Sequence, residues 1–251
     1  MTTDITPAVQ LKGLSKRFGT HIAVDAIDLI VPPGTFFGIV GPNGAGKSTT
    51  LAMTAGLLTP DSGSVTVAGV NAAEDREHVL SELGIMMEGL SLPERLTGSE
   101  LLEYTARLRR MGKDWPIRAA DLLEILHLDR APSTLIVDYS TGMRKKIGLA
   151  VALLHRPSVL VLDEPFEAID PVSARAIEGL LGQYVAGGGT VLLSSHLMDV
   201  VERTCERVAL IKDGRVVSEG TVDEVRAGRS LNDTFVDLVG APTNREIEWL
   251  A

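Results

Sequence analysis

Residues 41–49 of the chain read Gly41-Pro42-Asn43-Gly44-Ala45-Gly46-Lys47-Ser48-Thr49. This stretch matches G-x-x-x-x-G-K-[ST], a loop whose backbone N–H groups bind the phosphates of a nucleotide. In such a loop the lysine, here Lys47, reaches the β- and γ-phosphates, and the hydroxyl of Ser48 is a ligand for Mg²⁺. The sequence therefore predicts that all nine residues form a phosphate site.

The residues on either side of the loop support this prediction. Residues 35–40 are apolar and β-prone, as in a buried parallel strand. Residues 47–55 can form a helix, whose N-terminus would then point at the phosphates. The alternative is a plain glycine turn between a strand and a helix, which this placement and the partner residues found downstream both argue against.

The composition is that of an ordinary globular protein and limits the partners and the compartment that we expect. The chain has 251 residues, enough for one large α/β domain or two small ones, and its net charge of −9 argues against nucleic acid as the main partner. The single cysteine, Cys205, excludes an intrachain disulfide and favours a reducing compartment. No apolar run has the length of a bilayer span, and residues 1–8 lack the features of a signal peptide. We therefore expect a cytoplasmic protein, for which any membrane role requires a partner.

Hydrophobic patterning predicts an α/β core with a helical insertion. Apolar–polar alternation indicates antiparallel strands at 9–14 and 27–31, and a hairpin at 208–218 with an Asp213-Gly214 turn. The other expected elements are a helix that begins at the Thr97–Glu100 capping box, helices at 116–127 and from Ser140 to about 155, and buried strands at 159–163 and 190–194. We expect one domain over residues 1–240, with a helical lobe at about 97–155 and a C-terminal tail at 241–251.

A buried strand that ends in two carboxylates provides the chemistry that the loop needs. Asp163 follows four apolar residues and can hold Mg²⁺, while Glu164 can polarise a water that attacks the γ-phosphate. The alternative is a pair of acids that cap the strand, which would be costly if they were buried without a cation.

Three further residues have both a functional and a structural interpretation. Phe18, in a predicted loop ahead of the phosphate loop, either stacks on adenine or covers the sheet. Ser140 begins a helix, so it either belongs to an anion site or caps that helix. His196 follows a strand and either contacts the γ-phosphate or has a structural role.

The order of these motifs resembles the nucleotide-binding subunit of ABC transporters over about residues 8–220. The motifs are an aromatic loop, GPNGAGKST, YSTGM, LVLDEP, Ala168-Ile169-Asp170-Pro171 and His196. The resemblance implies an α/β fold: a P-loop NTPase core with a mainly parallel sheet, an antiparallel β subdomain and a helical insertion lobe. It also implies ATP and Mg²⁺ as cofactors, and two ATPase subunits, identical or different, that enclose ATP between them.

The resemblance also implies the roles of individual residues. Phe18 would stack on adenine, Glu164 would be the catalytic base and His196 the switch histidine. Ser140 and Gly142 would contact the γ-phosphate held by the other copy. Asp170 would lie in a loop that contacts the second subunit. The helical lobe would contact a membrane subunit.

Two departures from the family pattern stand out. The usual LSGGQ is YSTGM here, and Glu88 occupies the position of a glutamine in the loop that contacts Mg²⁺. We expect Glu88 to face the metal and the nucleotide, the alternative being that it points into solvent. Despite both departures, we expect the protein to hydrolyse ATP.

The YSxGM form and residues 230–235 resemble ATPases of the bacterial ABC-2 exporter type. This predicts an ATPase at the cytoplasmic face of the membrane, with a transmembrane permease subunit and a second ATPase subunit as partners and no nucleic acid. The alternatives are a non-transport ABC ATPase that acts on ribosomes or DNA, and a non-catalytic binding module.

Overall fold

The structure of the chain is a computed structural model that describes residues 6–89, 91–130 and 132–240. The predicted C-terminal tail, 241–251, lies outside the described residues.

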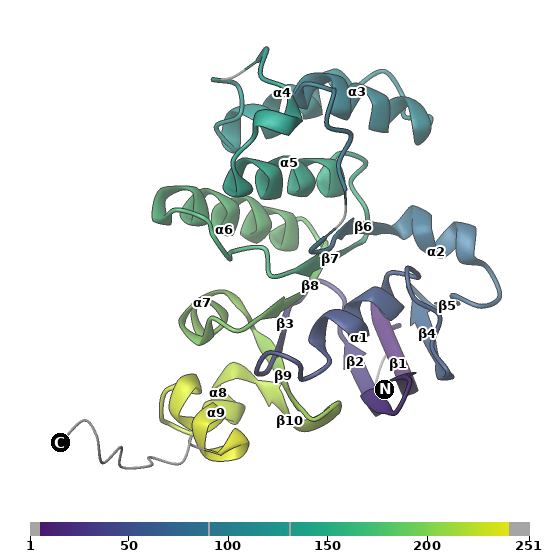
Figure 1. Ribbon diagram of the computed structural model, residues 1–251, viewed down its shortest axis with the longest axis vertical. Coiled ribbons are helices and arrows are strands. Elements are labelled where there is room, and N and C mark those ends of the chain that lie inside the picture. Colours follow the sequence, from purple (N-terminus) through teal and green to yellow (C-terminus); the bar gives the residue numbers. More distant parts are fainter. Residues whose placement is uncertain (1–5, 90, 131, 241–251) are drawn as a thin grey trace.

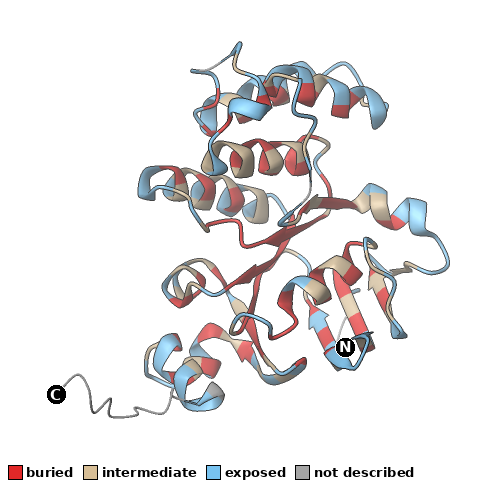
Figure 2. Cartoon of the chain, in the orientation of Figure 1, coloured by how far each residue is buried: buried red, intermediate tan, exposed pale blue. Residues whose placement is uncertain are grey.

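A six-stranded sheet runs through the centre of this described part of the chain (Figure 1). Its strands in spatial order are β10 (Arg215–Thr221), β9 (Arg207–Lys212), β3 (Phe36–Val40), β8 (Thr190–Ser195), β7 (Val159–Asp163) and β6 (Leu83–Met86). All neighbours are parallel except β9 and β10, which form the predicted hairpin. Asp213 and Gly214 both have positive φ in its turn, as a two-residue hairpin requires. Every residue of β3, β7 and β8 is buried (Figure 2), which is why the apolar residues of these strands follow one another without alternation.

A second sheet, four-stranded within the described residues, is antiparallel throughout. It consists, in spatial order, of β2 (His21–Val31), β1 (Val9–Phe18), β4 (Ser62–Val67) and β5 (Val70–Asn71). The prediction of a loop around Phe18 is wrong, because β1 continues to that residue and pairs it with His21. The pairing shifts register after Leu11, next to Gly13 at φ +56°, and this irregularity ends the alternation on which the prediction relied.

Helices cover both faces of the central sheet and define two cores. Helix α1 (Lys47–Thr54) lies between the two sheets, where it contacts β7 and β8 on one side and β1 and β2 on the other. On the opposite face, α6 (Pro171–Ala186) packs on β8 and α7 (Met198–Thr204) on β3. Successive residues of β3 serve different cores: Phe36 faces the helices, and Phe37 faces α1 and the second sheet. The shorter helices are α2 (Arg76–Glu82), α8 (Val222–Arg226) and α9 (Leu231–Val239).

The predicted helical lobe is present and stacks on one end of the core (Figure 1). It contains α3 (Gly98–Leu108), α4 (Trp115–Ile125), a 3₁₀ turn (Ile136–Asp138) and α5 (Thr141–Leu153). The Thr97–Glu100 capping box forms at the start of α3, and Ser140 caps α5. Helix α5 also contacts β6 and so joins the lobe to the sheet. None of the helices in the described part of the chain combines the length and apolar character that crossing a membrane requires.

Candidate active site

The glycine-rich loop connects β3 to α1, as predicted from the sequence. Gly44 and Gly46 have φ of +80° and +103°, a conformation that glycine adopts without strain. A Cβ at Gly46 would also clash with the carbonyl oxygen of Ala23 in β2, so the close approach of the two segments requires glycine there. Because α1 begins at Lys47, the free N–H groups of its first turn face the space above the loop.

A cavity of about 530 Å³ opens above this loop, within the range of ordinary ligand pockets. The loop lines it with Asn43, Gly44, Gly46, Lys47, Ser48 and Thr49. The β1–β2 hairpin contributes Phe18, His21 and Ala23, and the carboxyl ends of the central strands contribute Glu88, Glu164, Glu167 and His196. The structure thus brings four predicted residues from distant segments to the loop: Phe18, Glu88, Glu164 and His196.

Phe18 and Glu88 line the cavity from two different parts of the fold, the β1–β2 hairpin and the segment after β6. Half of the Phe18 surface is exposed, and Lys16 Nζ lies over its ring, 5.9 Å from the centroid. Glu88 follows β6 and also lines a second cavity, a groove of about 830 Å³ between the end of β6 and α5. The predictions that Phe18 stacks on adenine and that Glu88 faces the metal stay predictions, since both side chains are in place for them.

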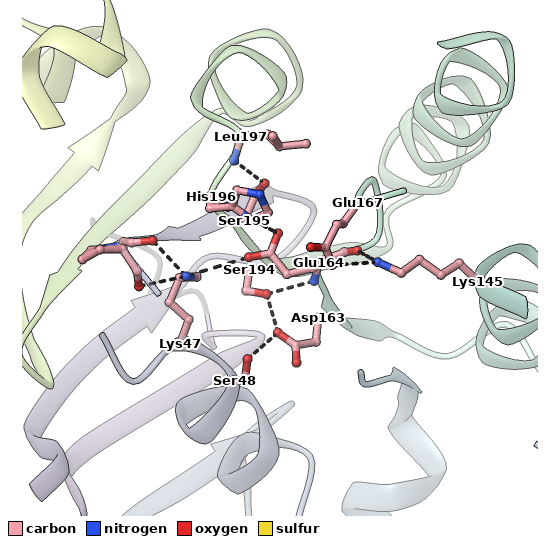
Figure 3. A network of polar contacts seen from close by, with 12 residues as sticks. Lys47, Ser48, Lys145, Asp163, Glu164, Glu167, Ser194, Ser195, His196 and Leu197 are labelled. Carbon is pink, nitrogen blue, oxygen red and sulfur yellow. Dashed lines mark hydrogen bonds and ion pairs between the residues drawn. The ribbon is translucent and has the colours of Figure 1, made fainter. Parts of the chain in front are cut away.

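Lys47 is the cation of the site and is almost entirely buried, with 6 % of its surface exposed. Its Nζ donates hydrogen bonds to the backbone oxygens of Gly41 (2.8 Å) and Pro42 (3.2 Å), and lies 3.8 Å from Glu164 Oε1 (Figure 3). Burial lowers the pKa of Lys47, while the carboxylates of Glu164 and Asp163 act in the opposite direction. A phosphate bound at the loop would place further negative charge next to this ammonium group. Gly41, Pro42 and Ala45 do not line the cavity themselves, and the first two hold Lys47 in place.

Asp163 lies at the end of β7, directly beside the start of α1. Its Oδ1 accepts hydrogen bonds from Ser48 Oγ (2.9 Å) and from Ser194 Oγ (2.6 Å). A hydroxyl and a carboxylate held together are hard oxygen donors of the kind that Mg²⁺ prefers, so this pair fits the ion. Ser194 was not predicted as a site residue from the sequence; the signal for it was a polar residue directly after the apolar run 191–193.

Glu164 has the most constrained backbone of the site. Its φ of +46° is left-handed, which costs a residue other than glycine about 1–3 kcal/mol. The carboxylate is buried and lies between His196 and Lys47: Oε2 is 3.0 Å from His196 Nδ1, and Oε1 is 3.8 Å from Lys47 Nζ. The backbone N–H of His196 also donates a hydrogen bond to Glu164 Oε2 (3.3 Å). Glu164 and His196 are therefore in contact with each other and adjacent to the phosphate loop.

Ser140, Gly142 and Asp170 do not line this cavity. Ser140 Oγ accepts the N–H of Met143 and caps α5, while Asp170 Oδ1 accepts the N–H groups of Val172 and Ser173 and caps α6. Gly142 lies next to the backbone of Ala168, so the start of α5 and the Asp170 loop are neighbours. Within one chain, the two capping residues act as helix caps, at a distance from the phosphate loop.

Two charged residues at the edge of the site, Lys145 and Glu167, were not predicted as site residues from the sequence. Lys145 Nζ donates to the backbone oxygen of Glu164 (2.8 Å) and lies 3.3 Å from Glu167 Oε2 (Figure 3). Both residues lie next to quoted motifs, YSTGM and LVLDEP, but sequence spacing did not show that they meet.

A P-loop nucleoside triphosphatase is defined by a glycine-rich loop before a helix, together with a carboxylate at the end of a neighbouring strand that is hydrogen-bonded to the serine of the loop. The family model described as "ABC transporter" matches residues 24–167, and the chain belongs to this family. It is an ABC-type ATP-binding protein and ATP hydrolase, as the order of its motifs predicted.

Relatives and solved structures agree with this assignment. The chain is 37 % identical over 253 residues to the daunorubicin/doxorubicin resistance ATP-binding protein DrrA of Streptomyces peucetius, covering 100 % of this chain and 76 % of DrrA. It is 33 % identical over 237 residues to the linearmycin resistance ATP-binding protein LnrL of Bacillus subtilis (strain 168), covering 94 % and 76 %. The ATP-binding subunit of an ABC transporter superposes with a TM-score of 0.87 at 29 % identity, covering 94 % of this chain and 100 % of that one. A dimeric cassette in a post-hydrolysis state bound to ADP and Pi gives 0.78 at 26 % identity, covering 85 % and 98 %.

Proposed function

We propose that two copies of this chain, or this chain and a similar one, bind ATP between them and hydrolyse it to drive a separate membrane-spanning exporter. One observation carries the proposal. The cavity at the phosphate loop contains Lys47, Glu164 and His196, whereas Ser140 lies outside it in the same chain. A second subunit whose Ser140 faces this cavity would complete the site.

Each residue of the site has a distinct task in this proposal. Lys47 and the N–H groups of α1 bind the phosphates, and Ser48 and Asp163 hold Mg²⁺, which neutralises charge on the phosphates. Glu164 orients and polarises the attacking water, while His196 contacts the γ-phosphate beside it. Positioning and charge stabilisation dominate phosphoryl transfer, so one well-placed carboxylate suffices as the base.

The membrane partner is inferred from the relatives and from the helical lobe. The chain resembles ATP-binding proteins whose names record resistance to daunorubicin, doxorubicin and linearmycin, and export of the compound is one route to resistance. The groove between β6 and α5, lined by Glu88, Leu92 and Arg144 among others, offers the permease a site on the lobe. The protein would then lie at the cytoplasmic face of the membrane, held there by the permease.

Replacement of Glu164 with glutamine tests the proposal. Glu164→Gln keeps the size of the side chain but removes its basicity, so we expect ATP binding to persist and hydrolysis to fall by roughly 10²- to 10⁴-fold. With ATP held uncleaved, the variant should elute as a dimer on gel filtration, and the parent protein with ADP should elute mainly as a monomer.

Glu77→Gln is the matched control, because Glu77 is an exposed glutamate on α2. It should hydrolyse ATP at the parental rate and show no ATP-dependent dimer. Parental activity in Glu164→Gln would remove Glu164 from the role of base. An inactive Glu164→Gln that binds ATP but stays monomeric would argue against the shared site.

A further inference from the structure

Lys145 extends from the helical lobe to the backbone of the proposed catalytic base (Figure 3). It lies in the second turn of α5, and only 15 % of its side chain is exposed. Its Nζ donates a 2.8 Å hydrogen bond to the carbonyl oxygen of Glu164. Hydrogen bonds from a charged donor are stronger than neutral ones, and shielding from water strengthens them further. The lobe therefore holds the main chain of Glu164 directly.

The backbone at Glu164 depends on such support. Its left-handed φ of +46° persists only where the surroundings over-determine it. The N–H of Glu164 donates to Ser194 Oγ on β8 (3.0 Å), and its carbonyl accepts both Lys145 Nζ and the N–H of Glu167 (3.3 Å). Ser194 therefore fixes one side of this residue from the core, and Lys145 fixes the other from the lobe. The direction of the Glu164 carboxylate, toward Lys47 and His196, follows from this backbone.

We propose that Lys145 is a positioning residue for hydrolysis, which keeps Glu164 oriented toward the attacking water as long as α5 stays against the core. The proposal rests on the role proposed above for Glu164. Lys145 does not line the nucleotide cavity, so it acts through Glu164 and does not touch ATP. The same helix begins at Ser140, so a shift of α5 would move that serine and release the Glu164 carbonyl together.

A simpler interpretation is that Lys145 only forms an ion pair with Glu167. The two side chains are 3.3 Å apart, and 42 % of the Glu167 side chain is exposed. Pairs of this kind near the surface contribute little. The shorter contact is the one to the Glu164 carbonyl, and an ion pair with Glu167 does not require it. The two interpretations predict different effects of Lys145→Met in a Glu167→Gln background, where the ion pair is already absent.

Lys145→Met removes the charged donor but keeps a long, unbranched side chain. We expect kcat to fall roughly 10-fold, because the base is displaced, with the KM for ATP and the affinity for ATP unchanged, because the phosphate loop is intact. Lys145→Arg retains a charged donor and should recover most of the rate. Lys113→Met, at an exposed lysine between α3 and α4, removes the same charge from the lobe and should match the parent. In a Glu167→Gln background, Lys145→Met should still lower kcat roughly 10-fold relative to Glu167→Gln alone, because the contact with the Glu164 carbonyl does not need the Glu167 carboxylate.

A double-mutant cycle shows whether Lys145 acts through Glu164. In a Glu164→Gln background, added Lys145→Met should leave the residual rate unchanged, because there is no base left to position. A further 10-fold loss there, a parental rate in Lys145→Met, no recovery in Lys145→Arg, or no effect of Lys145→Met in a Glu167→Gln background would overturn the proposal for Lys145 and leave the role of Glu164 standing. Full activity of Glu164→Gln alone would overturn both.

Discussion

At the scale of single residues, Glu88 is the feature in which the charge of the site departs most from the family pattern. It lines the nucleotide cavity together with Lys47 and Ser48. A glutamine there would present one carbonyl oxygen to Mg²⁺, whereas Glu88 adds a negative charge that attracts the metal and repels phosphate. Once ATP is bound the attraction should prevail, because a carboxylate is a good ligand for Mg²⁺.

Glu88→Gln should therefore change metal dependence and nucleotide affinity in different directions. We expect the Mg²⁺ concentration for half-maximal ATPase activity to rise by roughly 3- to 10-fold, and ATP binding without metal to tighten by a similar factor. The measurements are ATPase rates in a Mg²⁺ titration and ATP binding in the presence of a chelator. If neither quantity moves, Glu88 takes no part in the site.

At the scale of elements, the proposed function gives Ser140, the N-cap of α5, a role in the nucleotide cavity of the other copy. Ser140→Ala should leave ATP binding to the monomer within about 2-fold and lower the ATPase rate roughly 10-fold or more, because in the proposed dimer Ser140 contacts the phosphate that is bound by the other copy. Lys47→Ala should instead weaken ATP binding itself. Equal loss of monomer affinity in both variants would contradict this division of roles.

Loss of a helix cap gives Ser140→Ala a stability cost that needs its own control. Both Ser140 and Thr97 cap helices of the lobe, and the loss of either cap costs about 1 kcal/mol. Thr97→Ala should therefore lower the Tm as much as Ser140→Ala does, yet keep the parental ATPase rate. A comparable fall in rate in both variants would assign the effect of Ser140→Ala to the stability of the lobe.

The sequence predicts elements and motifs well where a local pattern specifies them. The phosphate loop, the apolar strand before Asp163, the Asp213-Gly214 hairpin and the capping box at Thr97 all formed as expected, because each depends on neighbours in the chain. The strand extension to Phe18 was missed, since a register shift next to Gly13 interrupts the alternation.

Contacts that depend on strand register or on how the lobe docks could not be predicted from the sequence. Ser194 reaches Asp163 because β7 and β8 pair these two residues directly, across a separation of 31 positions. Lys145 reaches Glu164 because α5 packs against the end of the sheet, which depends on how the lobe docks. Neither placement leaves a periodic or compositional trace in the sequence, although both residues support the proposed base.

At the scale of the whole molecule, the parts of one site come from separate layers. The antiparallel sheet supplies Phe18, the central sheet supplies Asp163 and Glu164, and the helical lobe carries Ser140 on a different surface. In a two-fold dimer each cavity would combine Glu164 of one copy with Ser140 of the other. Two variants that are each inactive, one at each residue, should then complement one another when mixed.

Mixing Ser140→Ala with Glu164→Gln tests this arrangement through activity alone. A mixed dimer has one cavity with both defects and one cavity with neither, so an equal mixture should recover about one quarter of the parental site activity if pairing is random. A chain that carries both substitutions, mixed with an equal amount of parent, is the control: every mixed dimer then has a defect in each cavity, and only parental pairs remain active. If both residues served the same chain's nucleotide, the two single variants would stay inactive when mixed, and the doubly substituted chain would leave its parental partner active. ATPase rates of the two mixtures, read at matched total protein, separate these arrangements.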